Sequence, residues 1–181
     1  MKRLALVVCL LLVVAVSYRF FGSAETGTGN LTLQQPAPVV GEDARTFAVE
    51  DTDGETFELT DQGIYVLTFW TTFNQGSDLA RPGFDRLARE YGGPGVTFAA
   101  AYVSGAPEEQ APYAVLQDGS GRLTSIYNVK RVPRLFLVQD GEIQFVQNYF
   151  YEVNERLLEE KLQELLAEED GRESERDGGR S

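Results

Sequence analysis

The segment from Val66 to Pro82 constrains the fold more than any other part of the chain. It begins with a largely apolar run, Val66 to Phe69, and continues through a tryptophan and a short polar loop into helix-favouring residues. A short apolar run bounded by turn residues is typical of a strand buried in a sheet. The segment therefore predicts a buried strand, a tight loop and a helix, which is a unit of an α/β domain.

Strand and helix patterns alternate along the rest of the domain. Strands are expected at residues 46–49, 56–59, 65–69, 96–102, 113–116, 134–138 and 143–149. A helix is expected from about Ser77 to Tyr91, with a helical turn before Tyr127, and Asp53-Gly54 and Asp140-Gly141 mark hairpin turns. A closing helix is predicted by apolar residues in steps of three and four. These residues are Val153, Leu157, Leu158, Leu162, Leu165 and Leu166.

Three segments, taken in order, resemble the thioredoxin-like superfamily, and within it the membrane-anchored TlpA/ResA-like branch related to the AhpC/TSA redoxins. The segment VLTFWTTFNQGSDLARP is similar to a family pattern of roughly VVLNFWASWCPPCRAEMP. Val40 to Leu59 is similar to the family's G-x-x-A-P-x-F motif and hairpin, with Arg45 where proline is usual. The third segment, Leu116 to Val146, matches at Asp118, Gly121, Tyr127, Val129, Val132, Pro133 and Gly141.

The resemblance covers about Val40 to Leu166 and implies an α/β thioredoxin-like fold. It implies a mixed central sheet with flanking helices and an N-terminal β-hairpin. One connection departs from the family, because only VSGAPEEQAP separates Tyr102 from Tyr113. A parallel crossover usually needs a dozen or more residues. We therefore expect a shortened crossover connection, with its helix reduced to a turn or an irregular strand at Tyr113.

The same alignment places Asn74, Gln75, Gly76 and Ser77 on the four positions of the family's C-x-x-C motif. Both redox positions therefore carry polar side chains without sulfur. The degenerate active-site loop comprises Trp70, Phe73, Asn74, Gln75, Gly76 and Ser77.

Sulfur and imidazole are missing from the whole chain beyond residue 24. The only cysteine is Cys9, the only methionine is Met1, and there is no histidine. Disulfide exchange requires a thiolate, and the Ser77 hydroxyl is a weak nucleophile without an activating base. The absence of histidine removes a common general base and imidazole zinc sites. Only oxygen-ligand metals remain open, and we expect no metal site and no cofactor.

Acidic residues outnumber basic ones, 28 to 16, and the formal net charge is −12. Three of the basic residues, Lys2, Arg3 and Arg19, lie in the first 24 positions, so the remainder is more acidic still. This charge argues against nucleic-acid binding and against docking on anionic lipid. Pairs of carboxylates are expected by chance in such a chain and are interpreted as solvated surface.

The N-terminal segment is typical of an exported protein. Lys2 and Arg3 precede the uncharged run Leu4 to Val16, as in a signal sequence. Cleavage after Ala24 would release a secreted protein, whereas an uncleaved segment would anchor the chain at the extracytoplasmic face of the cytoplasmic membrane, and we favour the anchor. We divide the chain into a signal anchor or signal peptide (1–24), a flexible linker (25–39), the thioredoxin-like domain (40–168) and a disordered acidic, polar tail (169–181).

Two interpretations of the degenerate loop remain open. Asn74 and Ser77 are preferred helix N-cap residues, and capping alone explains them. Alternatively, the loop and the backbone before Pro133 keep the family's peptide-binding groove, in which the bond before that proline is cis. The groove would hold an extended segment through main-chain hydrogen bonds. Its candidate residues are Arg131, Val132, Pro133 and Arg134.

Two function classes follow. The first is a redox-inactive thioredoxin-like module that binds an exported protein or peptide and is held to the membrane by its N-terminal segment. The second is an enzyme, which would be either a thiol-disulfide oxidoreductase by homology only or a cysteine-free catalyst using carboxylates. The second class predicts a buried acid near Thr68 or Pro133, and the nearest candidates are Asp78 and Asp118. We favour the binding module.

Overall fold

The computed structural model describes residues 36–105, 110–149 and 152–178. The predicted N-terminal signal segment and most of the linker lie outside these residues. Among the described helices, none has the length and apolar character needed to cross a membrane. The elements in chain order are β1 (Phe47–Glu50), β2 (Thr56–Leu59), β3 (Ile64–Trp70), α2 (Gln75–Tyr91), β4 (Val96–Tyr102), β5 (Ala114–Gln117), α3 (Arg122–Ile126), β6 (Arg134–Gln139), β7 (Glu142–Asn148) and α4 (Glu152–Gly178).

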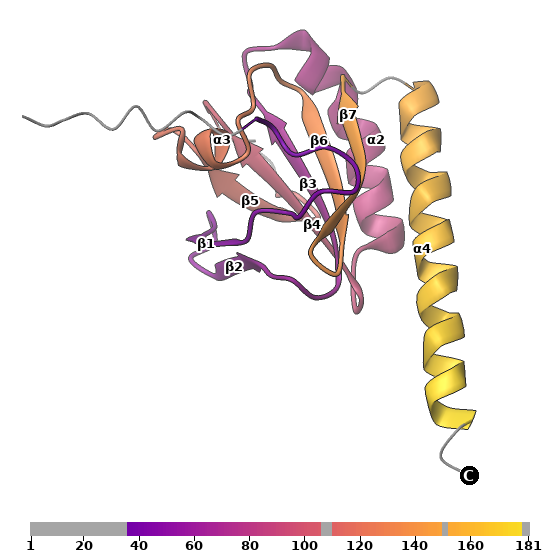
Figure 1. Ribbon diagram of the computed structural model, residues 1–181. Helices are drawn as coiled ribbons and strands as arrows, with labels where there is room; N and C mark the ends of the chain where they lie inside the picture. Colours follow the sequence, from indigo (N-terminus) through magenta and orange to yellow (C-terminus); the bar gives the residue numbers. More distant parts are fainter. Residues whose placement is uncertain (1–35, 106–109, 150–151, 179–181) are drawn as a thin grey trace, which may run out of the picture. The chain divides into compact units, whose positions relative to one another are not determined.

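A five-stranded mixed sheet in the order β5-β4-β3-β6-β7 forms the centre of the domain (Figure 1). Strand β3 pairs in parallel with β4 and antiparallel with β6, so it lies in the middle of the sheet. Strands β1 and β2 form a separate antiparallel hairpin. The mixed sheet, flanking helices and N-terminal hairpin expected from the sequence are confirmed.

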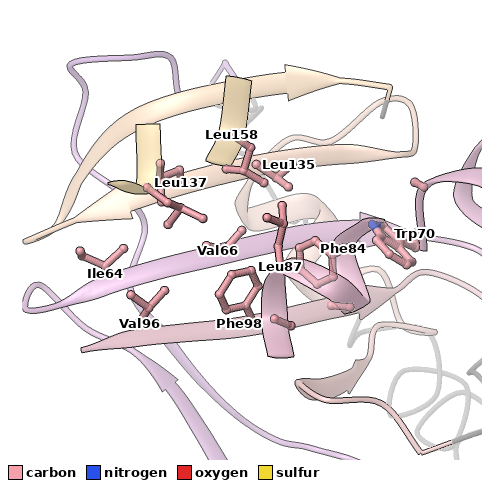
Figure 2. Packing of buried hydrophobic residues seen from close by; sticks show 14 of the residues in the cluster. Ile64, Val66, Trp70, Phe84, Leu87, Val96, Phe98, Leu135, Leu137 and Leu158 are labelled. Atoms are coloured by element: carbon pink, nitrogen blue, oxygen red, sulfur yellow. The ribbon is translucent and has the colours of Figure 1, made fainter. Parts of the chain in front are cut away.

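The two faces of the sheet have separate hydrophobic cores. In β3, Val66 and Trp70 face α2 and α4, whereas Leu67 and Phe69 face the β1–β2 hairpin and α3. Figure 2 shows the first of these cores, in which Phe84 and Leu87 of α2 meet the apolar side chains of the sheet. Because both faces are covered, β3 reads as a nearly continuous apolar run in the sequence.

Helix α2 is amphipathic and packs its apolar side on the sheet. Its buried residues include Ala80, Phe84, Leu87 and Ala88. The helix continues through Pro82, which lacks the N–H of one intrahelical hydrogen bond. It begins at Gln75, two positions before the expected start.

The connection from β4 to β5 is short, as predicted. Its described residues, 103–105 and 110–113, contain no helix. A right-handed crossover would lie on the α2 face of the sheet, and there the ring of Tyr113 packs 5.0 Å from Phe84 and 6.3 Å from Trp70, measured between ring centroids. An aromatic side chain thus covers part of the surface that a longer crossover would cover.

Helix α4 lies beside α2 (Figure 1) and buries Leu158, Leu162 and Leu165. Val153 and Leu157 were expected on the same face, but they remain 51% and 44% exposed. The helix also continues to Gly178, whereas a disordered tail was expected from residue 169. The expectation of disorder is therefore wrong for residues 169–178, where a charged sequence without apolar residues forms helix.

Candidate functional site

The loop between β3 and α2 ends in a helix cap. Asn74 has extended backbone angles, and its side-chain Oδ1 accepts a hydrogen bond of 2.7 Å from the N–H of Gly76. Its main-chain oxygen accepts from the N–H groups of Ser77 and Asp78. Asn74 therefore satisfies two of the backbone donors that a helix leaves free at its start, those of Gly76 and Ser77, and its oxygen accepts the first intrahelical bond from Asp78.

The Asn74 side chain also reaches the segment before Pro133. Its Nδ2 donates to the main-chain oxygen of Val132 over 3.3 Å. One side chain thus joins the two halves of the candidate site, which lie 58 residues apart in the sequence.

Gly76 and Pro133 are in close contact. A Cβ placed on Gly76 would lie 2.9 Å from Asn74 Oδ1 and 3.3 Å from Pro133 Cδ. The bond between Val132 and Pro133 is cis, as the resemblance implies. Only glycine allows both the Asn74 cap and the proline ring in their present places.

Ser77, on the second redox position, is 2% exposed. Its Oγ accepts a hydrogen bond of 3.4 Å from the N–H of Thr71. Thr71 Oγ1 is in turn 2.6 Å from Ser104 Oγ and accepts from the N–H of Phe73. The hydroxyls hold the loop together, and with no histidine in the chain Ser77 has no imidazole base.

Trp70, the last residue of β3, and Phe73, in the loop that follows, have opposite environments. Trp70 is 1% exposed, packs against Phe84 at 5.1 Å between centroids, and donates its Nε1–H to Thr68 Oγ1. Phe73 is 83% exposed. Of the two, only Phe73 offers an apolar surface to a ligand, and Trp70 belongs to the core shown in Figure 2.

Val132 presents an unused backbone donor. Within the described part of the chain, no acceptor takes its N–H, while its oxygen takes one hydrogen bond from Asn74. A carbonyl oxygen has two lone pairs. Val132 can therefore donate one main-chain hydrogen bond and accept another from an extended partner.

The arginines on either side of this segment differ in their surroundings. Arg131 is exposed, whereas Arg134 is partly buried, with its guanidinium 5.0 Å from the centroid of the Phe136 ring. Burial lowers the pKa of Arg134 below its ordinary value. Arg134 Nη1 donates to Asn148 Oδ1, and its buried Nε has no hydrogen-bond partner among the described residues.

The acidic candidates for a carboxylate catalyst do not form such a site. Asp118 is buried, but Oδ1 accepts from the N–H of Leu123 and Oδ2 accepts from the N–H and hydroxyl of Thr124, so it caps α3. Asp78 is exposed in the first turn of α2. In the described ranges, no group of three or more metal-binding side chains occurs.

A buried polar cluster near the end of β3 was not predicted from the sequence. Asp85 Oδ1 and the hydroxyls of Tyr102 and Tyr113 are buried as neighbours. Burial, followed by the neighbouring Tyr102 and Asp85, raises the pKa of Tyr113 well above its ordinary value, so the phenol stays protonated. The polar atoms belong to side chains in the α2-side core, and no sequence motif marks them.

Comparisons with known proteins identify the fold. No model of a protein family matches the chain, and no curated protein sequence matches it either. Among solved structures, the chain is similar to a protein described as thiol:disulfide interchange protein DsbE from Chlorobium tepidum, with a TM-score of 0.60 and 20% identity over 69% of this chain and 96% of that one.

Two further structures give the same result. The exposed lipoprotein thioredoxin Etrx1 of Streptococcus pneumoniae has a TM-score of 0.55 and 23% identity, over 66% of this chain and 99% of that one. StoA of Bacillus subtilis has a TM-score of 0.53 and 19% identity, over 68% of this chain and 98% of that one. At these identities the likeness concerns the fold, and the chain has a thioredoxin-like fold.

Proposed function

We propose that this chain is a redox-inactive thioredoxin-like module that binds an extended segment of an exported protein beside Val132. The composition excludes thiol chemistry in the domain, because no residue after Cys9 contains sulfur. Thiol-disulfide exchange needs a thiolate. The positions that would carry it hold Asn74 and Ser77, which are already engaged in the helix cap and the loop.

The observation that carries the proposal is the main-chain donor of Val132. It lies in the part of the chain just before β6 and is without an acceptor among the described residues. An extended ligand can satisfy such a donor by strand addition, in which main-chain hydrogen bonds give affinity and side-chain contacts give specificity. Exposed Phe73 supplies an apolar contact near the loop.

Asn74 supports the competing interpretation that the loop is only a cap. Its amide already uses one lone pair of the Val132 oxygen. This contact reduces the number of main-chain hydrogen bonds that Val132 can offer to a ligand. The N–H of Val132 and one lone pair of its oxygen are still available. The two interpretations therefore differ in a measurable way, namely whether a protein contacts this edge in the cell.

We place the module outside the cytoplasm, anchored at the cytoplasmic membrane by residues 1–24, or secreted if the chain is cleaved near Ala24. Lys2, Arg3 and the following apolar run support export. The Streptococcus protein of similar fold is described as an exposed lipoprotein, and one from Mycobacterium tuberculosis, at 18% identity and a TM-score of 0.51, is described as secreted.

Photocrosslinking in intact cells tests the proposal directly. A photoreactive residue replaces Gln75, the exposed first residue of α2, and adducts are identified by mass spectrometry. The control probe replaces Glu160, which is exposed on α4. A discrete protein adduct at position 75 alone is expected. Equal labelling at both positions, or none, contradicts a binding role for this edge.

The alternative enzyme class has its own test. A thiol-disulfide oxidoreductase catalyses the reduction of insulin by dithiothreitol, and the purified chain is expected to leave that rate at its uncatalysed value because both redox positions lack sulfur. Acceleration by the wild-type chain would contradict redox inactivity.

A further inference from the structure

A basic pocket lies beside Pro133. It has a volume of about 380 Å³, and its lining includes Lys130, Arg131, Arg134 and Asn148. Three basic residues at one pocket are notable in a chain with a net charge of −12. Grouping like charges in one place raises the energy of the folded state, so the cluster is not expected on stability grounds alone.

The arginines of this pocket lack acidic partners. Among the described residues, neither Arg131 nor Arg134 forms an ion pair, whereas Arg86 on α2 contacts three glutamates. Arg134 is held in place by Phe136 and Asn148, and its buried Nε–H has no acceptor there. Asn148 takes only one of the Nη N–H groups, so the guanidinium, held against Phe136, keeps further donors for an oxygen anion.

The pocket adjoins the main-chain edge of the proposed function. Val132 lies between the two arginines in the sequence, and Pro133 lines the pocket. When an extended ligand pairs with Val132, alternate ligand side chains point to the same side. One of these side chains can therefore enter the pocket while the ligand backbone meets the N–H of Val132.

We propose that this pocket receives the side-chain carboxylate of an aspartate or glutamate in the extended segment that binds beside Val132. The inference rests on the proposed function and adds the chemical class of the ligand. A nucleic-acid phosphate does not fit, because the acidic remainder of the chain repels a polyanion. A single carboxylate on an otherwise neutral or basic segment meets two arginines that have no ion pair with any described residue, and it avoids that penalty.

Peptide binding by the full chain in neutral detergent tests the inference. The probe is an array of nonapeptides with both ends blocked, in which each acidic peptide has a partner with glutamine or asparagine at the same place. Arg131→Gln and the double variant Arg131→Gln/Arg134→Gln remove the charges. Arg89→Gln is the matched control, because Arg89 is exposed near the opposite end of α2 and has no ion pair among the described residues.

The wild type is expected to bind acidic peptides about tenfold or more tightly than their amide partners, since hydrogen bonds to charged groups are the stronger ones. The double variant is expected to lose this preference, while Arg89→Gln keeps it. Arg131→Gln, at an exposed site, is expected to lose part of the preference without changing the thermal midpoint, which separates recognition from folding.

Three results overturn the inference. Equal binding of acidic and amide peptides overturns the carboxylate class but leaves the binding function standing. Binding only of peptides with a free C-terminal carboxylate, tested on a second array, overturns the side chain as its source. Failure to bind any peptide, together with absence of the position-75 adduct in cells, contradicts the proposed function itself.

Discussion

The two ends of helix α2 are fastened in different ways. At its N-terminal end, uncharged contacts predominate, in which Asn74 caps the helix and Gly76 meets Pro133. Toward its C-terminal end, Arg86 and Tyr91 bond to acidic residues of α4. The C-terminal part is thus committed to another element of the same chain, whereas the N-terminal end adjoins an unused backbone donor and the exposed Phe73 ring. This difference is the reason to place ligand binding at the N-terminal end.

The largest effect is expected where α4 packs against the α2-side core. Leu162→Ala should lower the free energy of unfolding by about 2–5 kcal/mol, because Leu162 is 0% exposed and its removal leaves a cavity. Leu157→Ala on the same helix is the control, since Leu157 is 44% exposed and should change that free energy by at most about 0.5 kcal/mol. Denaturant unfolding measures both, and equal losses would show that α4 is not docked as described.

Asn74→Ala should have the next largest effect. It removes the helix cap and leaves the Val132 oxygen without its amide donor, so we expect the free energy of unfolding to fall by about 1–2 kcal/mol. Asn74→Asp keeps an oxygen that can cap the helix but loses the Nδ2 donor. If the cap dominates, the aspartate variant should recover most of the loss in urea unfolding. No recovery would assign the stability to the bond with Val132.

The strand pattern of the domain was readable from the sequence, because both faces of the central strands are covered and their apolar runs are long. The bounds of β2 and β4 agree with the expected ranges, and β3 differs by one residue at each end. The far end of α4 was not predicted. Its composition indicated disorder, but charged pairs four residues apart, such as Glu168 with Arg172 at 3.7 Å, support a helix that has no apolar face.

The site was predictable only in part. A cap at Asn74 follows from the residue type and its place before a helix. Its bond to Val132 does not, since local patterns cannot pair residues so far apart in the chain. The contrast between buried Trp70 and exposed Phe73 also needed the strand register, because both are large aromatic residues close together in the sequence. That Arg134 has no acidic partner among the residues the structure describes could be learned only from which strands lie side by side.

Gly76→Ala tests the N-terminal end of α2 further, with a smaller expected change in the free energy of unfolding. Alanine favours helix over glycine by about 1 kcal/mol, but at this position the added Cβ displaces the Asn74 side chain and presses on Pro133. The two effects oppose each other, so we expect a net loss of about 0–1 kcal/mol in unfolding free energy and a weaker crosslink from position 75. Gly171→Ala in α4 is the matched control, since its Cβ meets no atom within 4 Å and the change should stabilise the protein. Stabilisation by both substitutions would refute the close contact at Pro133.

A similarly small effect is expected at the charged end of α2, where it should depend on pH. The hydrogen bond from Arg86 lowers the pKa of Glu159 below its ordinary value. A carboxylate whose pKa is lowered by folding stabilises the folded state above its unfolded pKa, and this contribution disappears as the pH falls through the folded pKa. Because Arg86 is largely exposed, Glu159→Gln should cost only about 0.5–1 kcal/mol at pH 7. The variant and the wild type should therefore converge in unfolding free energy as the pH falls through the lowered pKa of Glu159. Glu160→Gln, whose partner Arg156 is 3.7 Å away at the surface, should match the wild type throughout. A constant difference between Glu159→Gln and the wild type across this pH range would mean that the carboxyl group stabilises α4 by packing and not by its charge. The two ends of α2 would then not differ in the use of ion pairs.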